Sequence, residues 1–150
     1  MRVVIQRVAR ASVRIEGALV ASLGKGLLVL LGIEELDTTE DIGWLVGKVA
    51  KMRIFSDAAG LMNLAVGDVD GNVLVVSQFT LHAATKKGNR PSFIRAARPE
   101  LAVPLYEAFL LALETELGKR VERGVFGADM QVDLCNDGPV TIVMDSKNRE

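Results

Sequence analysis

Two apolar runs, residues 27–33 and 73–76, constrain the fold of this chain more than any other feature of its sequence. Neither run alternates between polar and apolar positions, which is typical of a strand that is covered on both faces. Residues 11–15 do alternate, so a strand with one buried face is predicted there. Residues 2–8 and 18–23 are also predicted to be strands, and the first third of the chain therefore builds a sheet.

Two helices are predicted to accompany these strands. In the first, apolar residues recur at helical spacing behind Asp37 and Glu40, whose separation by three positions resembles a capping box. The second helix is predicted to begin near Pro104, which suits a first helical position, and to end at Gly118.

Two closing strands are predicted at residues 130–135 and 140–144, and residues 145–150 are expected to fray. Many strands with only two helices predict a mixed α/β fold. The few crossover helices argue against a doubly wound parallel sheet. A length of 150 residues fits one domain, so residues 1–150 are expected to form a single domain.

The overall composition excludes several classes of function. A net charge of -1 gives no global attraction to nucleic acid or to a membrane, so an anionic partner must meet a local basic patch. No apolar run approaches the ~20 residues of a membrane span, and no signal peptide is evident. We therefore expect a cytoplasmic protein with no membrane partner. The single cysteine, Cys135, cannot form an internal disulfide and is expected to be a reduced, inert thiol.

Most of the common catalytic arrangements are excluded by what the chain lacks. His82 is the only histidine, so a Ser-His-Asp triad could use no other, and a surface histidine without a catalytic role is the favoured interpretation. One histidine and one cysteine are too few for a zinc site. The sequence has no Walker A peptide and no dinucleotide-binding fingerprint, so no metal and no cofactor are expected.

A short polar peptide, Ser77-Gln78-Phe79-Thr80, directly follows the second apolar run. Hydroxyls, an amide and backbone N–H groups at the end of a strand can bind a carbonyl or stabilise an oxyanion. The Thr80 hydroxyl is a weak nucleophile at neutral pH, and only His82 could activate it. By itself, the peptide is equally compatible with an active site and with a strand end that buries Phe79 in the core.

A basic segment follows this peptide. Residues 71–99 contain no acidic residue but include Lys86, Lys87 and Arg90. A solvated loop is the ordinary explanation for such charges. The position directly after the polar peptide favours a second interpretation, in which these three side chains contact the phosphates of a nucleic acid.

The motifs of this chain resemble those of the D-aminoacyl-tRNA deacylases in the same order and over nearly its whole length. The segments that carry the resemblance are residues 1–8, 24–29, 77–81, 87–88, 90–93, 126–130 and 136–141. The resemblance implies a homodimeric hydrolase that cleaves the ester between a D-amino acid and the terminal adenosine of tRNA, and that also removes mischarged glycine. It further implies a barrel-like core of mixed β-sheet with two main helices on one face, in β/β/α layers.

The resemblance also implies how such an enzyme selects its substrate. Gly138 and Pro139, joined by a cis peptide bond, would enter the partner subunit's pocket, where their carbonyls leave no room for an L side chain. Arg7 would brace this element, and Asn136 begins the same signature. The sequence alone does not assign the isomer, because only about 5–6% of X–Pro bonds in folded proteins are cis.

The remaining site residues are likewise assigned by the resemblance. Phe126 and Met130 match positions near the terminal adenosine, where stacking on a base is expected. The floor of the pocket would be formed by Phe79 together with the catalytic group Ser77, Gln78 and Thr80. The family is thought to use the 2′-hydroxyl of the tRNA itself, which agrees with the lack of a base in this peptide.

Two other functions remain open from the residues. One is a non-catalytic RNA-binding module that uses the basic segment and Phe126. The other is a small hydrolase in which Thr80 and His82 act together on free esters or D-peptides without tRNA. The three functions differ in whether aminoacyl-tRNA is bound, cleaved or ignored.

Overall fold

One long strand organises the sheet of this protein. In the computed structural model, which describes residues 1–150, β1 (Arg2–Ile15) pairs antiparallel with β3 (Gly26–Gly32) through its first half and with β2 (Ala18–Leu23) through its second half. On its other side, β8 (Gln131–Asp145) runs antiparallel to β1 along nearly its full length. β1 is therefore a central strand throughout, whereas β8 pairs with nothing else and forms an edge.

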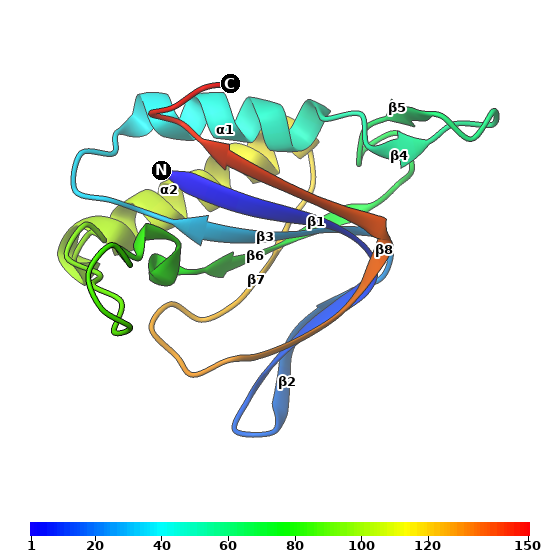
Figure 1. The fold of residues 1–150 in the computed structure, drawn as a ribbon. Helices are drawn as coiled ribbons and strands as arrows, with labels where there is room; N and C mark the ends of the chain where they lie inside the picture. The colour runs from blue at the N-terminus through cyan, green and yellow to red at the C-terminus, as the bar shows by residue number, and fades with distance from the viewer.

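Parallel pairing extends the sheet on the other side of β3. β6 (Asn72–Ser77) lies parallel to β3, and the short β7 (Glu122–Arg123) lies parallel to β6. β2 curls beneath the sheet toward β6 and β7, so the strands form the barrel-like, nearly closed arrangement seen in Figure 1. The expected mixed α/β fold with a barrel-like sheet is confirmed.

Two helices cover one face of the sheet (Figure 1). The remaining elements are α1 (Thr39–Lys51), β4 (Phe55–Ser56), β5 (Met62–Leu64), the 3₁₀ turn η1 (Phe79–His82) and α2 (Pro99–Leu117). β4 and β5 form a separate hairpin that projects from the sheet. Neither helix combines the length and the hydropathy needed to cross a bilayer.

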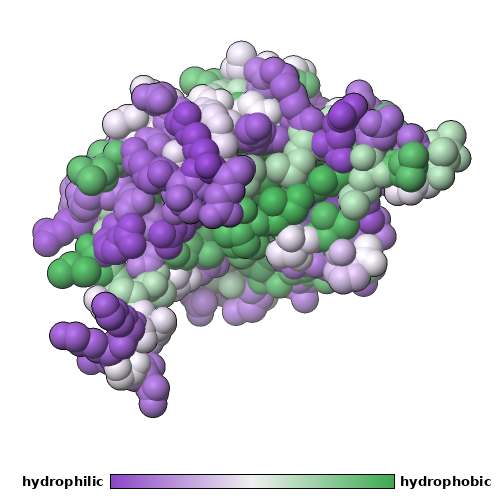
Figure 2. Space-filling view, turned by 45° about the horizontal axis from the view of Figure 1, so that its top comes forward, coloured by the Kyte–Doolittle hydropathy of each residue, from purple (hydrophilic) through white to green (hydrophobic).

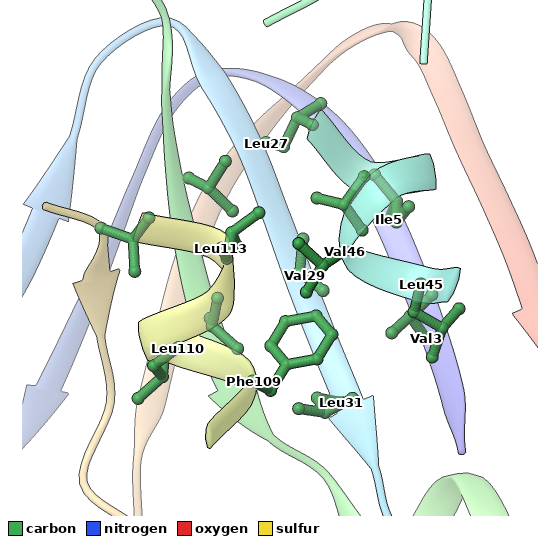
Figure 3. Close-up of a cluster of buried hydrophobic side chains, with 14 of the residues drawn as sticks. Val3, Ile5, Leu27, Val29, Leu31, Leu45, Val46, Phe109, Leu110 and Leu113 are labelled. Carbon is green, nitrogen blue, oxygen red and sulfur yellow. The ribbon is translucent and has the colours of Figure 1, made fainter. Parts of the chain in front are cut away.

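The apolar run at residues 27–33 is buried on both faces, as predicted. Val29 and Leu31 point toward the helices and pack in the cluster that contains Phe109 (Figure 3). Leu28 points the other way, into a second cluster with Leu74, beneath the curled part of the sheet. Each such buried side chain stabilises the fold by about 1.5–3 kcal/mol relative to exposure, which is why alternation is absent here.

Helix α1 begins one residue later than the capping pattern predicted. Thr38 is the N-cap, and its hydroxyl accepts a hydrogen bond from the N–H of Glu40 at 3.3 Å. The Asp41 carboxylate accepts the reciprocal bond from the Thr38 N–H at 2.8 Å. Asp37 is instead buried and accepts a hydrogen bond from the N–H of Glu34 at 2.8 Å. The box shifts because Asp37 is used to close the preceding turn.

The predicted start of the second helix is also wrong. α2 begins at Pro99, and Pro104 lies inside it. Pro104 has no N–H to donate to the carbonyl of Glu100, but that carbonyl belongs to the first turn of the helix, where Glu100 is exposed to water. Gly118 ends the helix with φ +68°, as predicted, because this left-handed conformation favours glycine.

The last residues are held down rather than frayed. Ser146 is buried, and its hydroxyl donates to Asp41 at 2.7 Å, while the Lys147 ammonium donates to the same carboxylate at 2.8 Å. Burial alone would raise the pKa of Asp41, but the hydrogen bonds from Lys147, Ser146 and Thr38 outweigh it and hold that pKa well below its usual range. The tail is thus tied to the start of α1.

Candidate functional site

The polar peptide lies where β6 leaves the sheet. The strand ends at Ser77, and the chain then turns into η1, so residues 79–82 do not continue the strand. The N–H of Gln78 still donates to the carbonyl of Leu31 on β3 at 2.7 Å, which fixes where the turn begins. Arg2 donates from Nη1 to the carbonyl of Leu81 at 3.0 Å and holds its far end.

Within this turn the side chains of Gln78 and Thr80 meet. The Gln78 Nε2 donates a hydrogen bond to the Thr80 hydroxyl at 2.5 Å, and both residues are half-buried. An amide is not a base at neutral pH, so this contact orients the hydroxyl without removing its proton. The arrangement can position an ester or donate to a developing oxyanion.

A cavity of about 250 Å³ opens beside the turn. Its lining includes five of the predicted site residues, which come from two segments far apart in the chain: Ser77, Gln78, Phe79, Phe126 and Met130. The rest of the lining is Leu31, Ile33, Val76, Ala97, Ala102, Gly127, Ala128 and Val132. Gly127 and Ala128 belong to the family motif at residues 126–130. The aliphatic lining residues could not be predicted, because in the sequence a residue that lines a pocket looks the same as one in the core.

The part of the cavity wall that Phe126 forms is anchored in the core. Phe126 packs on Tyr106 of α2 with 5.8 Å between ring centroids. The Tyr106 hydroxyl donates to the carbonyl of Val75 at 3.0 Å, and burial raises the pKa of this phenol to about 12. The hydroxyl therefore stays protonated and remains a donor. Its hydrogen bond to Val75 holds the Tyr106 ring in place, and Phe126 packs on that ring.

Phe79 stands at the mouth of the cavity, not in the core. Its side chain is 56% exposed and packs edge-on against Phe93, with 5.1 Å between ring centroids. The sequence had left open a core position for Phe79, and the structure excludes it. The 3₁₀ turn redirects the side chain away from the sheet.

The basic loop begins where η1 ends. A two-way backbone bridge between Ala84 and Ser92 closes the loop, with N···O distances of 2.8 and 3.0 Å. Lys86, Lys87 and Arg90 lie between these anchors and are all exposed. The three cations lie on the loop between η1 and Phe93 and do not line the cavity.

The second motif interrupts the β1–β8 ladder. Gln6 pairs with Thr141 and Val8 pairs with Asn136, so the single residue Arg7 faces residues 137–140, which loop out of β8. The two predicted closing strands are in fact one strand with this interruption. The loop is closed from inside, because the Asn136 side chain accepts from the Val140 N–H at 3.1 Å and donates to the Thr141 hydroxyl at 3.0 Å.

Arg7 ties the looped residues to the rest of the chain. Its Nε donates to the carbonyl of Asp137 at 3.0 Å, and its Nη1 donates to the carbonyl of Ile54, just before β4, at 2.6 Å. The Gly138–Pro139 peptide bond is cis, and both residues are exposed. Neither residue lines the cavity described above, so the structure does not bring them into the pocket of their own chain.

His82 is buried, which corrects the expectation of a surface histidine. Its side chain is 1% exposed, neither ring nitrogen has a hydrogen-bond partner, and the ring lies against Gly32. Burial lowers the pKa of the imidazole, so it is neutral at physiological pH. The 3₁₀ turn explains the error, because it points residue 82 into the interior. No group of His, Cys, Asp or Glu side chains is arranged to hold a metal ion.

Comparison with known proteins shows the family to which this sequence is similar. The family model described as D-Tyr-tRNA(Tyr) deacylase matches residues 4–145. Proteins named D-aminoacyl-tRNA deacylase from Akkermansia muciniphila and Flavobacterium johnsoniae are 67% and 65% identical over 150 residues, with 100% of both chains covered.

Solved structures show the same fold. The c-Myc DNA Unwinding Element Binding Protein superimposes with a TM-score of 0.90 at 41% identity, covering 97% of this chain and 98% of that one. A probable eukaryotic D-amino acid tRNA deacylase superimposes with a TM-score of 0.80 at 18% identity, covering 95% and 97%. The match to the family model and the full-length relatives show that this chain belongs to the D-aminoacyl-tRNA deacylase family.

Proposed function

We propose that this protein is a tRNA-editing hydrolase that cleaves the ester bond of D-aminoacyl-tRNA, and of mischarged glycyl-tRNA, while sparing L-aminoacyl-tRNA. One observation carries this proposal. The motif at residues 77–81, which is expected to hold the ester, and the motif at residues 126–130, which is expected to hold the adenosine, are far apart in the chain. Gln78 from the first and Met130 from the second line the same cavity. A full-length relative at 67% identity carries the name of that activity.

The chemistry of the pocket favours assistance by the substrate. Thr80 is held by the amide of Gln78, and the nearest histidine, His82, is buried and has no hydrogen-bond partner. No side chain is therefore placed to take a proton from the Thr80 hydroxyl. In the proposed reaction the 2′-hydroxyl of the terminal ribose assists hydrolysis, and Ser77, Gln78 and Thr80 position the ester and stabilise negative charge on its carbonyl oxygen.

Selection by handedness is proposed to come from a second copy of the chain. Gly138 and Pro139 are exposed, braced by Arg7 and absent from their own chain's cavity, so they are available to a neighbouring protomer. Carbonyl oxygens held beside the substrate α-carbon would collide with an L side chain and accept a D side chain on the other side. Glycine has no side chain that could collide with these carbonyl oxygens, so glycyl-tRNA would be cleaved as well.

The surface supports the proposal that the protein acts as a homodimer. β8 is an edge strand of 15 residues that pairs only with β1, so its outer edge is free, and its Val143 and Leu134 side chains are 69% and 36% exposed. Figure 2 shows a band of hydrophobic residues across one face, between hydrophilic areas. Contiguous exposed apolar surface of this kind is typical of an interface.

A direct assay tests the proposal. The protein is incubated with D-tyrosyl-tRNA, L-tyrosyl-tRNA and glycyl-tRNA, and the loss of the aminoacyl group is followed. We expect rapid loss from the first and third and sparing of the second. Equal hydrolysis of both tyrosyl-tRNA stereoisomers would overturn the proposed selection, and sparing of all three would overturn the enzymatic function.

A non-catalytic nucleic-acid-binding role is the second candidate. The exposed cations Lys86, Lys87 and Arg90 favour it, and so does the name of the structural relative at 41% identity, which describes a protein that binds a DNA unwinding element. It predicts binding of uncharged tRNA or DNA with no loss of the aminoacyl group in the same assay. A Thr80/His82 esterase is disfavoured, because the unpartnered ring of His82 makes no bond to Thr80.

A further inference from the structure

Gly124 lies directly after β7, at the point where the chain leaves the sheet. Its N–H donates to the carbonyl of Val75 in β6 at 3.0 Å, so its backbone is anchored in the parallel part of the sheet. The chain then turns, with the Ala128 N–H donating to the Val125 carbonyl at 3.2 Å, and returns as β8 (Figure 1). Met130, the last residue before β8, lies back over Gly124.

The space beside Gly124 is filled by the Met130 thioether. A Cβ on Gly124 would lie 2.6 Å from the Met130 Sδ, 3.6 Å from its Cε and 3.8 Å from Cγ2 of Val76. The first of these distances is one that real Cβ atoms essentially never show, so the Met130 side chain would have to shift. Gly124 does not have a positive φ, so a side chain at this position would disturb the Met130 thioether and not the backbone conformation.

The Met130 side chain lies between packed core and open space. It packs against the second core cluster, whose member Val76 is only 2% exposed and cannot give way. It also lines the cavity together with Val76 and Phe126, so the cavity offers room for a displaced thioether. Methionine is flexible, so an added methyl group at Gly124 would push the thioether into the cavity without breaking β7.

We propose that Gly124 is a positioning residue for the substrate pocket, because its missing side chain seats Met130 against the sheet and keeps room for the nucleoside. The inference rests on the proposed function for its substrate, since Met130 is expected to lie beside the terminal adenosine. It assigns a role to a residue that touches neither the substrate nor the catalytic group. Gly124 acts only by setting the position of the Met130 thioether.

A double-mutant cycle tests this role, using deacylation of D-tyrosyl-tRNA by the wild type, Gly124→Ala, Met130→Ala and the double variant. We expect Gly124→Ala to raise KM about tenfold with a smaller change in kcat, because lost binding space affects bound substrate and transition state alike. In the Met130→Ala background the same substitution is expected to change KM by less than about twofold, since the collision is gone. An equal effect in both backgrounds would overturn the proposal.

A second measurement separates this inference from the proposed function. With methyl-labelled methionine, the Met130 signal, assigned from its loss in Met130→Ala, is expected to shift in Gly124→Ala, and adenosine 5′-monophosphate is expected to perturb it less than in the wild type. An unshifted signal would overturn the positioning role whether or not the protein is an enzyme. A shifted signal in a protein without deacylase activity would leave the positioning role intact and remove the proposed function.

Two controls complete the test: a glycine substitution elsewhere in the chain, and the folding of the variants. Gly47→Ala, on α1 where an added Cβ meets nothing, is expected to leave both KM and the Met130 signal unchanged. Should Gly124→Ala fail to fold, the double variant is expected to fold, because it lacks the atom that the new methyl group strikes. Failure of both to fold would show that Gly124 serves the sheet itself and would overturn the proposal.

Discussion

The Nη2 atom of Arg7 lies 2.9 Å from the position that a Cβ on Gly138 would occupy. Two consequences follow for the element that these residues build. Gly138 has φ +132°, a backbone conformation that side-chain-bearing residues rarely adopt. The guanidinium that braces the loop also fills the space beside it, so this position requires a glycine for both reasons.

Gly138→Ala is therefore expected to impair both stability and activity. Strain at this φ costs about 1–3 kcal/mol, and the new methyl group would displace Arg7 and the carbonyls that it holds. Gly60→Ala is the matched control, because Gly60 also has positive φ, +81°, but open space around its Cβ. We expect both variants to lose stability in urea unfolding, and only Gly138→Ala to lose more than about tenfold in kcat/KM for D-tyrosyl-tRNA. Similar kinetics for the two variants would contradict the steric account.

Replacing Thr80 is expected to have a modest effect. Because Thr80 is held by an amide and faces no base, Thr80→Ala should lower kcat by less than about a hundredfold, whereas loss of a true nucleophile costs about a millionfold. A D-aminoacyl-tRNA that ends in 2′-deoxyadenosine should react much more slowly with the wild type. The measurement is single-turnover deacylation of both substrates by both proteins. The reverse pattern would identify Thr80 as the nucleophile.

Removing the loop cations is expected to weaken tRNA binding through its salt dependence. Lys86, Lys87 and Arg90 are exposed on one loop, so changing all three to Ala should reduce the slope of log K against log salt by up to about 0.7–0.9 per charge that contacts a phosphate. Lys51→Ala is the control, since Lys51 pairs with Glu116 at the far end of α1. Binding is measured by titration over a range of salt concentrations. An unchanged slope in the triple variant would remove these side chains from the interface.

His82 is expected to make stability depend on pH. Burial holds the pKa of its imidazole below the value of about 6.5 that it has in the unfolded chain, so the unfolded state binds the proton first as pH falls. The contribution of the neutral, buried His82 to the free energy of unfolding is therefore intact above about pH 6.5 and is lost progressively below that pH. Urea unfolding of the wild type and His82→Leu between pH 5 and 8 measures this difference. The variant should show the shallower decline toward low pH, and parallel curves would contradict the prediction.

The local sequence pattern predicted where the long strands lie and that two helices accompany them. The uninterrupted apolar run at residues 27–33 predicted a strand covered on both faces, and Leu28 and Val29 do point into two different clusters. Gly118 ended a helix as predicted, because a left-handed C-terminal position selects glycine by itself. The family motifs identified the pocket residues that carry polar or aromatic groups.

The tertiary structure decided which side chains are neighbours. The local pattern could not show that η1 turns His82 inward and Phe79 outward, nor that residues 131–145 form one strand interrupted opposite Arg7. Nor could it show that Met130 fills the space left by Gly124. Hydrophobic periodicity reports only whether a side chain is buried, because burial is a property of one residue and its local geometry. Which partner fills a given space depends on the register and curvature of strands far apart in the chain, and only the assembled sheet sets those.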